Sequence, residues 1–323
     1  MKAIVQEAYG SADVLRLADI DKPELENDEV LVRVHAAGLD RGAWHFMTGL
    51  PYLMRIAGAG FRAPKNPVRG REGAGRVEAI GSGVTRFSPG DDVMGICEGA
   101  FAEYARARAD KLARKPANLT FEQAAAVPIS GSTALQALRN QGRVEPGQRV
   151  LIIGASGGVG TFAVQLAKAF GADVTAVCST AKIDLVRSIG ADHVIDYTRE
   201  DFAAGGARFD LVLDIGGNRS LSHLRRALTP RGTLVIVGGE GGGRWIGGTD
   251  RQVRALASSP FLKQRLRVFI AREHYEELEV LTELIEAGKV TPVVDRTYPL
   301  GEAPDALRSL EEGSVRGKAV ITV

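Results

Sequence analysis

The stretch from Arg149 to Thr180 reads RVLIIGASGGVGTFAVQLAKAFGADVTAVCST. It begins with a short apolar run, Val150 to Ile153, which is typical of a buried parallel strand. A glycine-rich turn follows, and apolar side chains then recur at helical spacing as far as Phe170. Asp173 to Cys178 has the pattern of a second strand. The stretch therefore predicts a strand, a glycine turn, a helix and a second strand, in that order.

The glycine turn, Gly154 to Gly160, has the spacing of a phosphate-binding loop, with Ala155 at the first position of the usual G-x-G-x-x-G pattern. A backbone without Cβ can turn tightly and approach a pyrophosphate, which the free N–H groups of the next helix then face. Glycine at the third position lets helix and strand pack closely. We expect a dinucleotide to bind here; the alternative is a glycine-rich turn without a ligand. The residues predicted to contact it are Ser156, Gly157, Gly158, Val159 and Gly160.

The composition is that of an ordinary globular protein with room for two domains. The chain has 323 residues, of which 45% are hydrophobic and 25% charged, and its formal net charge is +2. This charge gives no reason to expect nucleic acid or a membrane as the main partner. Two cysteines, Cys97 and Cys178, are too few for a disulfide framework or a cysteine-rich zinc site. Because the N-terminus also lacks an apolar signal core, we expect a cytoplasmic protein with buried free thiols.

The order of the predicted elements divides the chain into two domains. Short strands and frequent turns fill the first part, including the alternating segment Glu29 to Ala36, and they predict a compact β-barrel. Strands and helices then alternate, and six strands predict a doubly wound parallel sheet. A β pattern returns in the last 30 or so residues. We predict an α/β fold with a β-barrel domain at residues 1–125, completed by 290–323, and a Rossmann domain at 126–289.

Two long segments fall outside this regular pattern. Leu39 to Pro67 carries several aromatic side chains, and a connection of this length in a compact domain is more often functional than idle. Gly238 to Pro260 is rich in glycine and arginine. It is either a mobile loop with a solvated basic face, or a flap over a ligand or a dimer contact.

Together these features resemble the medium-chain dehydrogenase/reductase superfamily, and within it the zinc-free quinone oxidoreductase branch that includes zeta-crystallin. The resemblance covers essentially the whole chain. It implies a GroES-like catalytic domain, an inserted Rossmann domain, hydride transfer from a nicotinamide cofactor in the cleft between them, and commonly a homodimer. The motifs that carry it are the N-terminal MKAIV, the EVLVRVHAAGL strand, Gly70 to Gly75 (GREGAG), Phe87 to Asp91 (FSPGD), the AAAVP run ending at Pro128, the glycine turn, and Gly317-Lys318.

The residue types argue against a zinc site. Zinc-dependent relatives carry Gly-His-Glu where this chain has Gly70-Arg71-Glu72, and a guanidinium cannot ligate zinc. Their first cysteine falls around Leu39-Asp40, where this chain has none, and the residues after Cys97 leave no room for a four-cysteine lobe. Since a catalytic zinc needs three protein ligands, we predict no metal.

The end of the second strand predicts NADPH rather than NADH. NAD-binding units place an acidic residue about 20 residues past the glycines, but here Ser179-Thr180-Ala181-Lys182 carries no carboxylate to repel a 2′-phosphate. In the family a serine or threonine, a lysine and a tyrosine bind that phosphate, and Ser179, Lys182 and Tyr197 match these positions, with Thr180 beside them. The alternatives are a surface lysine and a packing tyrosine. By resemblance, further cofactor contacts are Thr133, Gly238, Gly239, Phe269, Ile270 and Lys318.

Without a metal, the substrate must itself accept a hydride easily. Quinones and α,β-unsaturated carbonyls do so because the resulting anion is delocalised, and the protein then mainly supplies orientation and a dry pocket. Candidate pocket residues are Asp40, Trp44 and Tyr52, of which Tyr52 could protonate or hydrogen-bond the oxyanion or merely line the pocket. The family often has asparagine where Asp40 stands, and a carboxylate there could repel anionic substrates. For His45 we prefer a loop or surface histidine.

Three functions stay open from the sequence. The first is an NADPH-dependent quinone or enone oxidoreductase. The second is an enoyl-thioester or ketone reductase of a biosynthetic pathway, which shares the fold and the cofactor. The third is a non-enzymatic NADPH-binding sensor or single-stranded RNA-binding protein, although the near-neutral charge argues against RNA.

Overall fold

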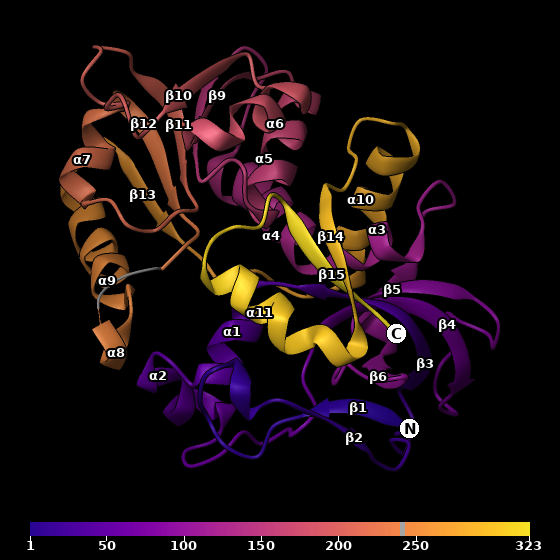
Figure 1. Cartoon of the computed structure of the whole chain (residues 1–323). Coiled ribbons are helices and arrows are strands. Elements are labelled where there is room, and N and C mark those ends of the chain that lie inside the picture. The colour runs from indigo at the N-terminus through magenta and orange to yellow at the C-terminus, as the bar shows by residue number, and fades with distance from the viewer. Residues whose placement is uncertain (240–242) are drawn as a thin grey trace. The chain divides into compact units, whose positions relative to one another are not determined.

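The computed structural model describes residues 1–239 and 243–323, which form two compact units (Figure 1). The first unit contains Met1–Ser132, Glu273–Gly288 and Pro292–Val323, and the second contains Thr133–Arg272 and Lys289–Thr291. The predicted ranges differ from this division, because they ended the first domain at residue 125 and gave residues 273–288 to the Rossmann domain.

Helix α10, Tyr275–Glu286, belongs to the first unit, because its residues form hydrogen bonds and an ion pair with residues of that unit. The Asn118 amide donates to the Ile285 carbonyl at 2.9 Å, and Arg86 pairs with Glu279 at 2.7 Å. The amphipathic pattern of this segment is typical of a helix, but periodicity does not say which partner the apolar face will meet. The residues buried along that face are Leu278, Leu281 and Ile285.

Within the described residues, the first unit is built on a seven-stranded sheet whose order is β14-β15-β3-β4-β5-β7, with β6 paired to β3. A separate hairpin pairs β1, Lys2–Val5, with β2, Arg16–Asp19. Strand β15 runs antiparallel to β3, so the predicted return of the C-terminus to the first domain is confirmed. The strands are β3 (Glu29–Leu39), β4 (Glu72–Ile80), β5 (Asp92–Ile96), β6 (Tyr104–Arg108), β7 (Leu112–Arg114), β14 (Val294–Pro299) and β15 (Lys318–Thr322).

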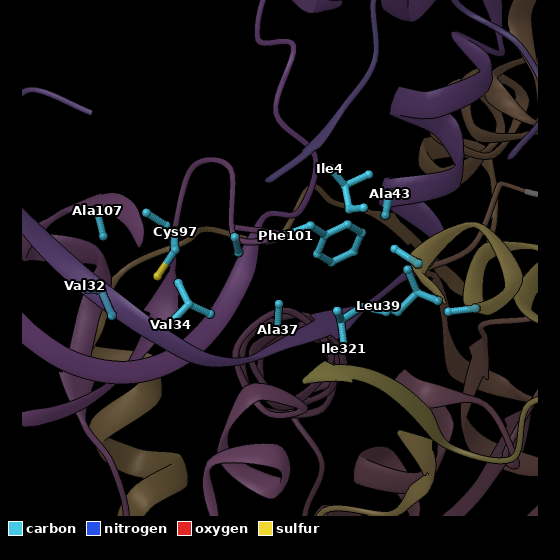
Figure 2. Packing of buried hydrophobic residues seen from close by; sticks show 14 of the residues in the cluster. Ile4, Val32, Val34, Ala37, Leu39, Ala43, Cys97, Phe101, Ala107 and Ile321 are labelled. Atoms are coloured by element: carbon cyan, nitrogen blue, oxygen red, sulfur yellow. The ribbon is translucent and has the colours of Figure 1, made fainter. Parts of the chain in front are cut away.

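Strand β3 is buried along almost its whole length, although alternation predicted a half-buried strand. Only Arg33 on it is exposed. The reason is that both faces of the strand are covered: Val30, Val32 and Val34 enter the hydrophobic core on one face. On the other face His35 stacks on Phe121, with 4.3 Å between the ring centres. Figure 2 shows residues of β3, among them Val32, Val34 and Leu39, in the core around Phe101.

Short helices complete the first unit, and two of them lie in the segment expected to be a long connection. These are α1, Arg41–Thr48, and α2, Tyr52–Met54. Helix α4 begins at Pro128, because proline fits the first helical turn, where its missing N–H would have no partner. The others are α3 (Phe121–Ala125), α4 (Pro128–Gln136), which continues into the second unit, and α11 (Ala303–Glu311).

The second unit is a parallel sheet with six strands among the described residues, in the order β10-β9-β8-β11-β12-β13. Numbered from the first strand of this unit, the order is 3-2-1-4-5-6, that of a dinucleotide-binding fold. The predicted doubly wound sheet is confirmed. The strands are β8 (Arg149–Ile153), β9 (Asp173–Cys178), β10 (His193–Asp196), β11 (Phe209–Asp214), β12 (Leu228–Ile236) and β13 (Arg265–Val268).

Helices connect these parallel strands, as crossover connections between parallel strands require. They are α5 (Gly158–Ala169), α6 (Ile183–Ser188), α7 (Leu221–Arg226), α8 (Gly243–Ile246) and α9 (Thr249–Ser258). Residues 240–242 of the predicted irregular segment lie outside the described residues. In the part of the chain that the structure describes, no helix combines the length and apolarity needed to cross a bilayer.

Candidate active site

The glycine turn runs from the end of β8 into the first turn of α5. Gly154 has φ of 85°, in the left-handed region that favours glycine. A Cβ on Gly160 would lie 2.1 Å from the Gly154 carbonyl oxygen, whereas a Cβ on Gly157 would lie 3.6 Å from the same atom. Gly160 therefore closes the helix onto the strand, while Gly157 leaves the space around it open.

The start of α5 has the chemistry of an anion-binding site. Gly157 is its N-cap residue, and no side chain caps the helix. The first backbone N–H groups of a helix have no partner within it, and the helix dipole favours negative charge at this end. The predicted residues Ser156 to Gly160 thus lie together at the carboxyl end of β8, where ligands of doubly wound sheets bind. This geometry fits the pyrophosphate of a dinucleotide.

The carboxyl ends of β9 and β10 bring together the residues predicted to bind a 2′-phosphate. The two strands are parallel neighbours, with Cys178 opposite Asp196. The Tyr197 N–H donates to the Cys178 carbonyl at 3.1 Å, and the Lys182 N–H donates to the Ser179 carbonyl at 2.9 Å. Ser179, Lys182 and Tyr197 therefore belong to one small region of the second unit.

Asp196 places a carboxylate in this same region, which the residues after β9 did not reveal. It accepts hydrogen bonds from the Thr180 hydroxyl at 2.5 Å and from the Thr198 hydroxyl at 2.7 Å. These hydrogen bonds lower the pKa of Asp196, so the group is ionised at neutral pH. Residues 179–182 carry no carboxylate. The pairing of β10 with β9 nevertheless brings Asp196 close to Thr180.

A buried ion pair holds the residues that follow the carboxyl end of β12. The Arg251 guanidinium donates to Asp214 at 2.5 Å and to the Gly238 carbonyl at 2.9 Å. A Cβ on Gly238 would lie 2.1 Å from the Ile215 carbonyl oxygen, so glycine is needed for this close approach. Gly238 and Gly239, both predicted cofactor contacts, are thereby fixed at the carboxyl edge of the sheet. Arg251 and Asp214 were not predicted, since only the folded sheet brings them together.

The other predicted cofactor contacts of the second unit are Thr133, Phe269 and Ile270. Phe269 and Ile270 follow β13 directly, on the edge of the sheet where the glycine turn also lies. Ile270 is 94% exposed, so it has no packing role within this unit. Thr133 is half-buried in α4, at the start of the second unit.

In the first unit, Asp40 and Trp44 lie on the same face of α1. Asp40 is the N-cap of this helix, and its Oδ1 accepts from the Ala43 N–H at 3.1 Å. Asp40 Oδ2 and Trp44 Nε1 are both buried, and neither has a hydrogen-bond partner among the described residues. The start of α1 therefore carries one unsatisfied acceptor and one unsatisfied donor. Buried polar groups in this condition call for a partner such as a bound molecule or water.

Tyr52 and His45 have other surroundings. The Arg55 guanidinium carbon lies 4.8 Å from the centre of the Tyr52 ring and 4.2 Å from that of Tyr9. The His45 Nδ1 lies 2.7 Å from the Leu50 carbonyl oxygen. His45 lies half-buried on α1 rather than in a loop. Its ring connects this helix to Leu50 in the turn that follows.

Parts of the chain match known protein families. Residues 26–117 match the alcohol dehydrogenase GroES-like domain, and residues 189–321 match the zinc-binding dehydrogenase family. The chain is 34% identical to the NAD(P)H oxidoreductase RTN4IP1, mitochondrial, of Mus musculus, over 100% of this chain and 89% of that protein. The chain belongs to the medium-chain dehydrogenase/reductase superfamily, in its quinone oxidoreductase-like branch.

Two solved structures of this superfamily extend the likeness to the whole fold. The quinone oxidoreductase of Coxiella burnetii has a TM-score of 0.88 and 32% identity, covering 100% of this chain and 99% of that one. The quinone oxidoreductase of Escherichia coli complexed with NADPH has a TM-score of 0.84 and 26% identity, with complete coverage of both chains. The two units are therefore the GroES-like domain and the Rossmann domain of this superfamily.

Lys318 lies inside the GroES-like domain and has a partner there. Its ammonium group, in a side chain that is 2% exposed, donates to the buried carboxylate of Glu72. Glu72 also accepts from the Ile129 N–H at 2.8 Å. Burial raises the pKa of Glu72, and the nearby Lys318 opposes that rise. The predicted contact between Lys318 and the cofactor stays a prediction.

Arg71 stands where zinc-dependent members of the superfamily have histidine, and its side chain also has a partner. Arg71 pairs with Glu273 at 2.5 Å. Burial, and then the neighbouring Glu72, raise the pKa of the Cys97 thiol to about 12, so this thiol is not ionised at neutral pH. Within the residues that the structure describes, no three or more His, Cys, Asp or Glu side chains are grouped to hold a metal ion.

Proposed function

We propose that this chain is an NADPH-dependent oxidoreductase that transfers a hydride to a quinone or an α,β-unsaturated carbonyl without a metal. The observation that carries the proposal is the uncapped glycine start of α5 at the carboxyl edge of the parallel sheet. The NAD(P)H oxidoreductase from mouse and the quinone oxidoreductases described above support the cofactor and the reaction class.

NADPH is preferred over NADH because of the charges at the ends of β9 and β10. Lys182 supplies an ammonium group and Ser179 a hydroxyl for the 2′-phosphate, with Tyr197 beside them. The negative charge of Asp196 opposes binding of the 2′-phosphate, but the hydroxyl groups of Thr180 and Thr198 donate hydrogen bonds to both of its oxygens. A net gain of a few kcal/mol corresponds to roughly two orders of magnitude in affinity.

Bound NADPH would supply the hydride, which carries two electrons, and would leave as NADP⁺. The residues of the GroES-like domain bind and orient the acceptor. The Trp44 indole N–H, which has no hydrogen-bond partner among the described residues, donates to the substrate oxygen, and Tyr52 supplies the proton that completes the product. A quinone that gains the hydride and this proton becomes a hydroquinone, and an enone becomes a saturated carbonyl.

A metal is not needed for this reaction, and the donor set of the chain does not favour one. Arginine at position 71 cannot act as a ligand, and its guanidinium is paired with Glu273. We expect dialysis against a chelator to leave the rate unchanged. Stoichiometric zinc in the purified protein, with activity lost on chelation, would contradict this part of the proposal.

The deciding experiment is a turnover panel. Quinones, enones, enoyl-thioesters and aldehydes are each tested with NADPH and with NADH. We expect NADPH to be consumed with quinones or enones, and kcat/KM to be much lower with NADH. Preference for an enoyl-thioester would instead indicate a biosynthetic reductase. Tight NADPH binding with no turnover of any acceptor would indicate a sensor.

A homodimer and a cytoplasmic location, expected from the resemblance and the composition, remain proposals. Light scattering of the purified protein measures the first. Fractionation of cells that produce the chain from its own gene measures the second.

A further inference from the structure

A cavity of about 240 Å³ lies within the GroES-like domain. Its volume is below the roughly 300–1,000 Å³ of pockets for drug-sized ligands, so it suits a small molecule or one end of a larger one. Ala43 and Phe46, three residues apart on α1, form one wall. Ala43 also belongs to the buried cluster that contains Phe101 (Figure 2), so the core lies behind this wall. Val68 and Pro64 add further apolar surface.

Arg69 is one of the residues that line this cavity, and among the described residues no carboxylate pairs with its charge. Arg69 is only 7% exposed, and its Nε is buried without any hydrogen-bond partner. Its Nη1 reaches the Phe46 carbonyl at 3.4 Å, and its Nη2 donates to the Asn66 carbonyl. Among the described residues, the partners of this guanidinium are these two carbonyl groups, and none is an acidic side chain.

A buried charge of this kind is costly. Taking an ion out of water costs several kcal/mol unless a counter-charge or a full set of hydrogen bonds replaces the lost hydration. Burial lowers the pKa of Arg69 to about 10, which still leaves the guanidinium charged at neutral pH. An anion entering the cavity would supply the missing counter-charge, and the planar guanidinium matches a carboxylate best.

The other charged groups of the lining do not cancel this charge. Lys65 is exposed. Arg71 is paired with Glu273, and that carboxylate also lies 3.3 Å from Lys111. Glu98 is the acidic residue of the lining, and its largely exposed carboxylate lies 3.5 Å from Arg106. The cavity therefore favours a negative ligand.

We propose that this cavity binds a small organic carboxylate, whose acidic group pairs with Arg69 while its apolar body packs against Phe46 and Val68. The carboxylate belongs either to the substrate itself or to a separate acid that binds independently of the reaction. The first of these two sources rests on the proposed reductase function. Both sources share the same chemistry at Arg69.

The first test measures binding without catalysis. Benzoate and its neutral counterpart benzamide are titrated into the full-length protein by calorimetry at low ionic strength. The variant Arg69→Met removes the charge and keeps an unbranched side chain, and Arg62→Met removes an exposed arginine of the same segment as a matched control. We expect benzoate to bind the parent and Arg62→Met equally, and Arg69→Met at least tenfold more weakly. Benzamide should not distinguish the three proteins.

The second test separates the two sources of the carboxylate. The enone trans-3-benzoylacrylate and its neutral ethyl ester are compared as acceptors for NADPH. If the substrate carries the acid, Arg69→Met lowers kcat/KM at least tenfold for the acid and leaves that for the ester unchanged. If the acid is a separate ligand, both enones respond alike to Arg69→Met and benzoate does not compete with either. If neither enone is reduced but benzoate binding still depends on Arg69, the reductase proposal fails and the carboxylate site stands.

Equal benzoate affinity in the parent protein and a folded Arg69→Met would overturn the proposal, as would the absence of benzoate binding to the parent. Thermal unfolding of each variant establishes that it is folded. Should Arg69→Met not fold, Arg69→Lys keeps the charge but loses the planar guanidinium. An affinity of Arg69→Lys for benzoate equal to that of the parent would then count against the pairing.

Discussion

At the scale of single residues, two glycines of one turn have separable roles. Gly160 has no room for a Cβ beside the Gly154 carbonyl, whereas Gly157 has. We expect Gly160→Ala to destabilise the protein by about 1–3 kcal/mol, as overpacking does. Gly157→Ala should leave stability nearly unchanged and weaken NADPH binding about tenfold or more, because its methyl group occupies the path of the pyrophosphate. Urea unfolding and NADPH fluorescence titration measure the two effects, and a reversed pattern would contradict these roles.

Lys182 carries the preference for NADPH in the proposed site. We expect Lys182→Ala to raise the KM for NADPH by about 10–100-fold, because a charge-assisted contact with the 2′-phosphate is lost. The KM for NADH should stay the same, since that cofactor lacks the phosphate. The exposed Lys263 provides a control, as Lys263→Ala should change neither value. Equal losses for both cofactors would assign Lys182 a structural role.

At the scale of elements, Asp40 is both the N-cap residue of α1 and a candidate residue of the substrate pocket. Its Oδ1 caps α1 and its Oδ2 has no partner. Asparagine preserves the capping oxygen and alanine removes it. We expect Asp40→Ala to lose about 1 kcal/mol of stability and Asp40→Asn to lose almost none. If Asp40→Asn also keeps kcat but improves kcat/KM for an anionic acceptor, the carboxylate acts by repulsion. A loss of kcat in a fully stable Asp40→Asn would instead give this carboxylate a part in the chemistry.

The ends of β9 and β10 should respond to acid. Hydrogen bonds from Thr180 and Thr198 lower the pKa of Asp196 in the folded state below its unfolded value of about 3.9. The unfolded chain then binds the proton more readily, so the stabilisation is present above pH 4 or so and is lost as the pH falls through the folded-state pKa. We expect Asp196→Asn to lose less stability than the parent between about pH 5 and pH 2. Melting temperatures across this range measure the effect, and the exposed Asp19→Asn should follow the parent curve.

At the scale of the whole molecule, the two thiols report on global unfolding. Both Cys97 and Cys178 are buried, and burial raises the pKa of each. Since the thiolate is the reactive form, a disulfide reagent such as DTNB should label almost no thiol in the native protein at pH 8. In urea we expect two thiols per chain to react. Rapid labelling of the native protein would show that one of the domains opens locally.

Local patterns in the sequence predicted the architecture well, because each parallel strand and its glycine turn is encoded within about 30 residues. The six Rossmann strands were predicted, as was the return of the C-terminus to the first domain. Contacts between segments that are distant in the sequence were not predicted. Asp196 beside Thr180, and Arg251 beside Asp214, are neighbours only because parallel strands end at one edge.

The same limit applies to the candidate site of the GroES-like domain. Asp40 could have been recognised as a helix cap, since aspartate followed by a helical run is a known start signal. No local pattern marks Arg69 as a buried arginine, because burial depends on how its segment packs against α1. The assignment of α10 failed for the same reason, since an apolar stripe does not name its partner.

The place of β15 has a consequence for synthesis on the ribosome. This strand, Lys318–Thr322, lies between β14 and β3 and completes a sheet that begins near the other end of the chain. The Rossmann domain is nearly continuous in sequence and is fully synthesised before β15, so it can fold while translation is still in progress. The GroES-like domain cannot close until Lys318–Thr322 has been synthesised. During that interval the edge of β3 that β15 will cover is open, so a nascent chain needs protection there from pairing with its neighbours on the polysome.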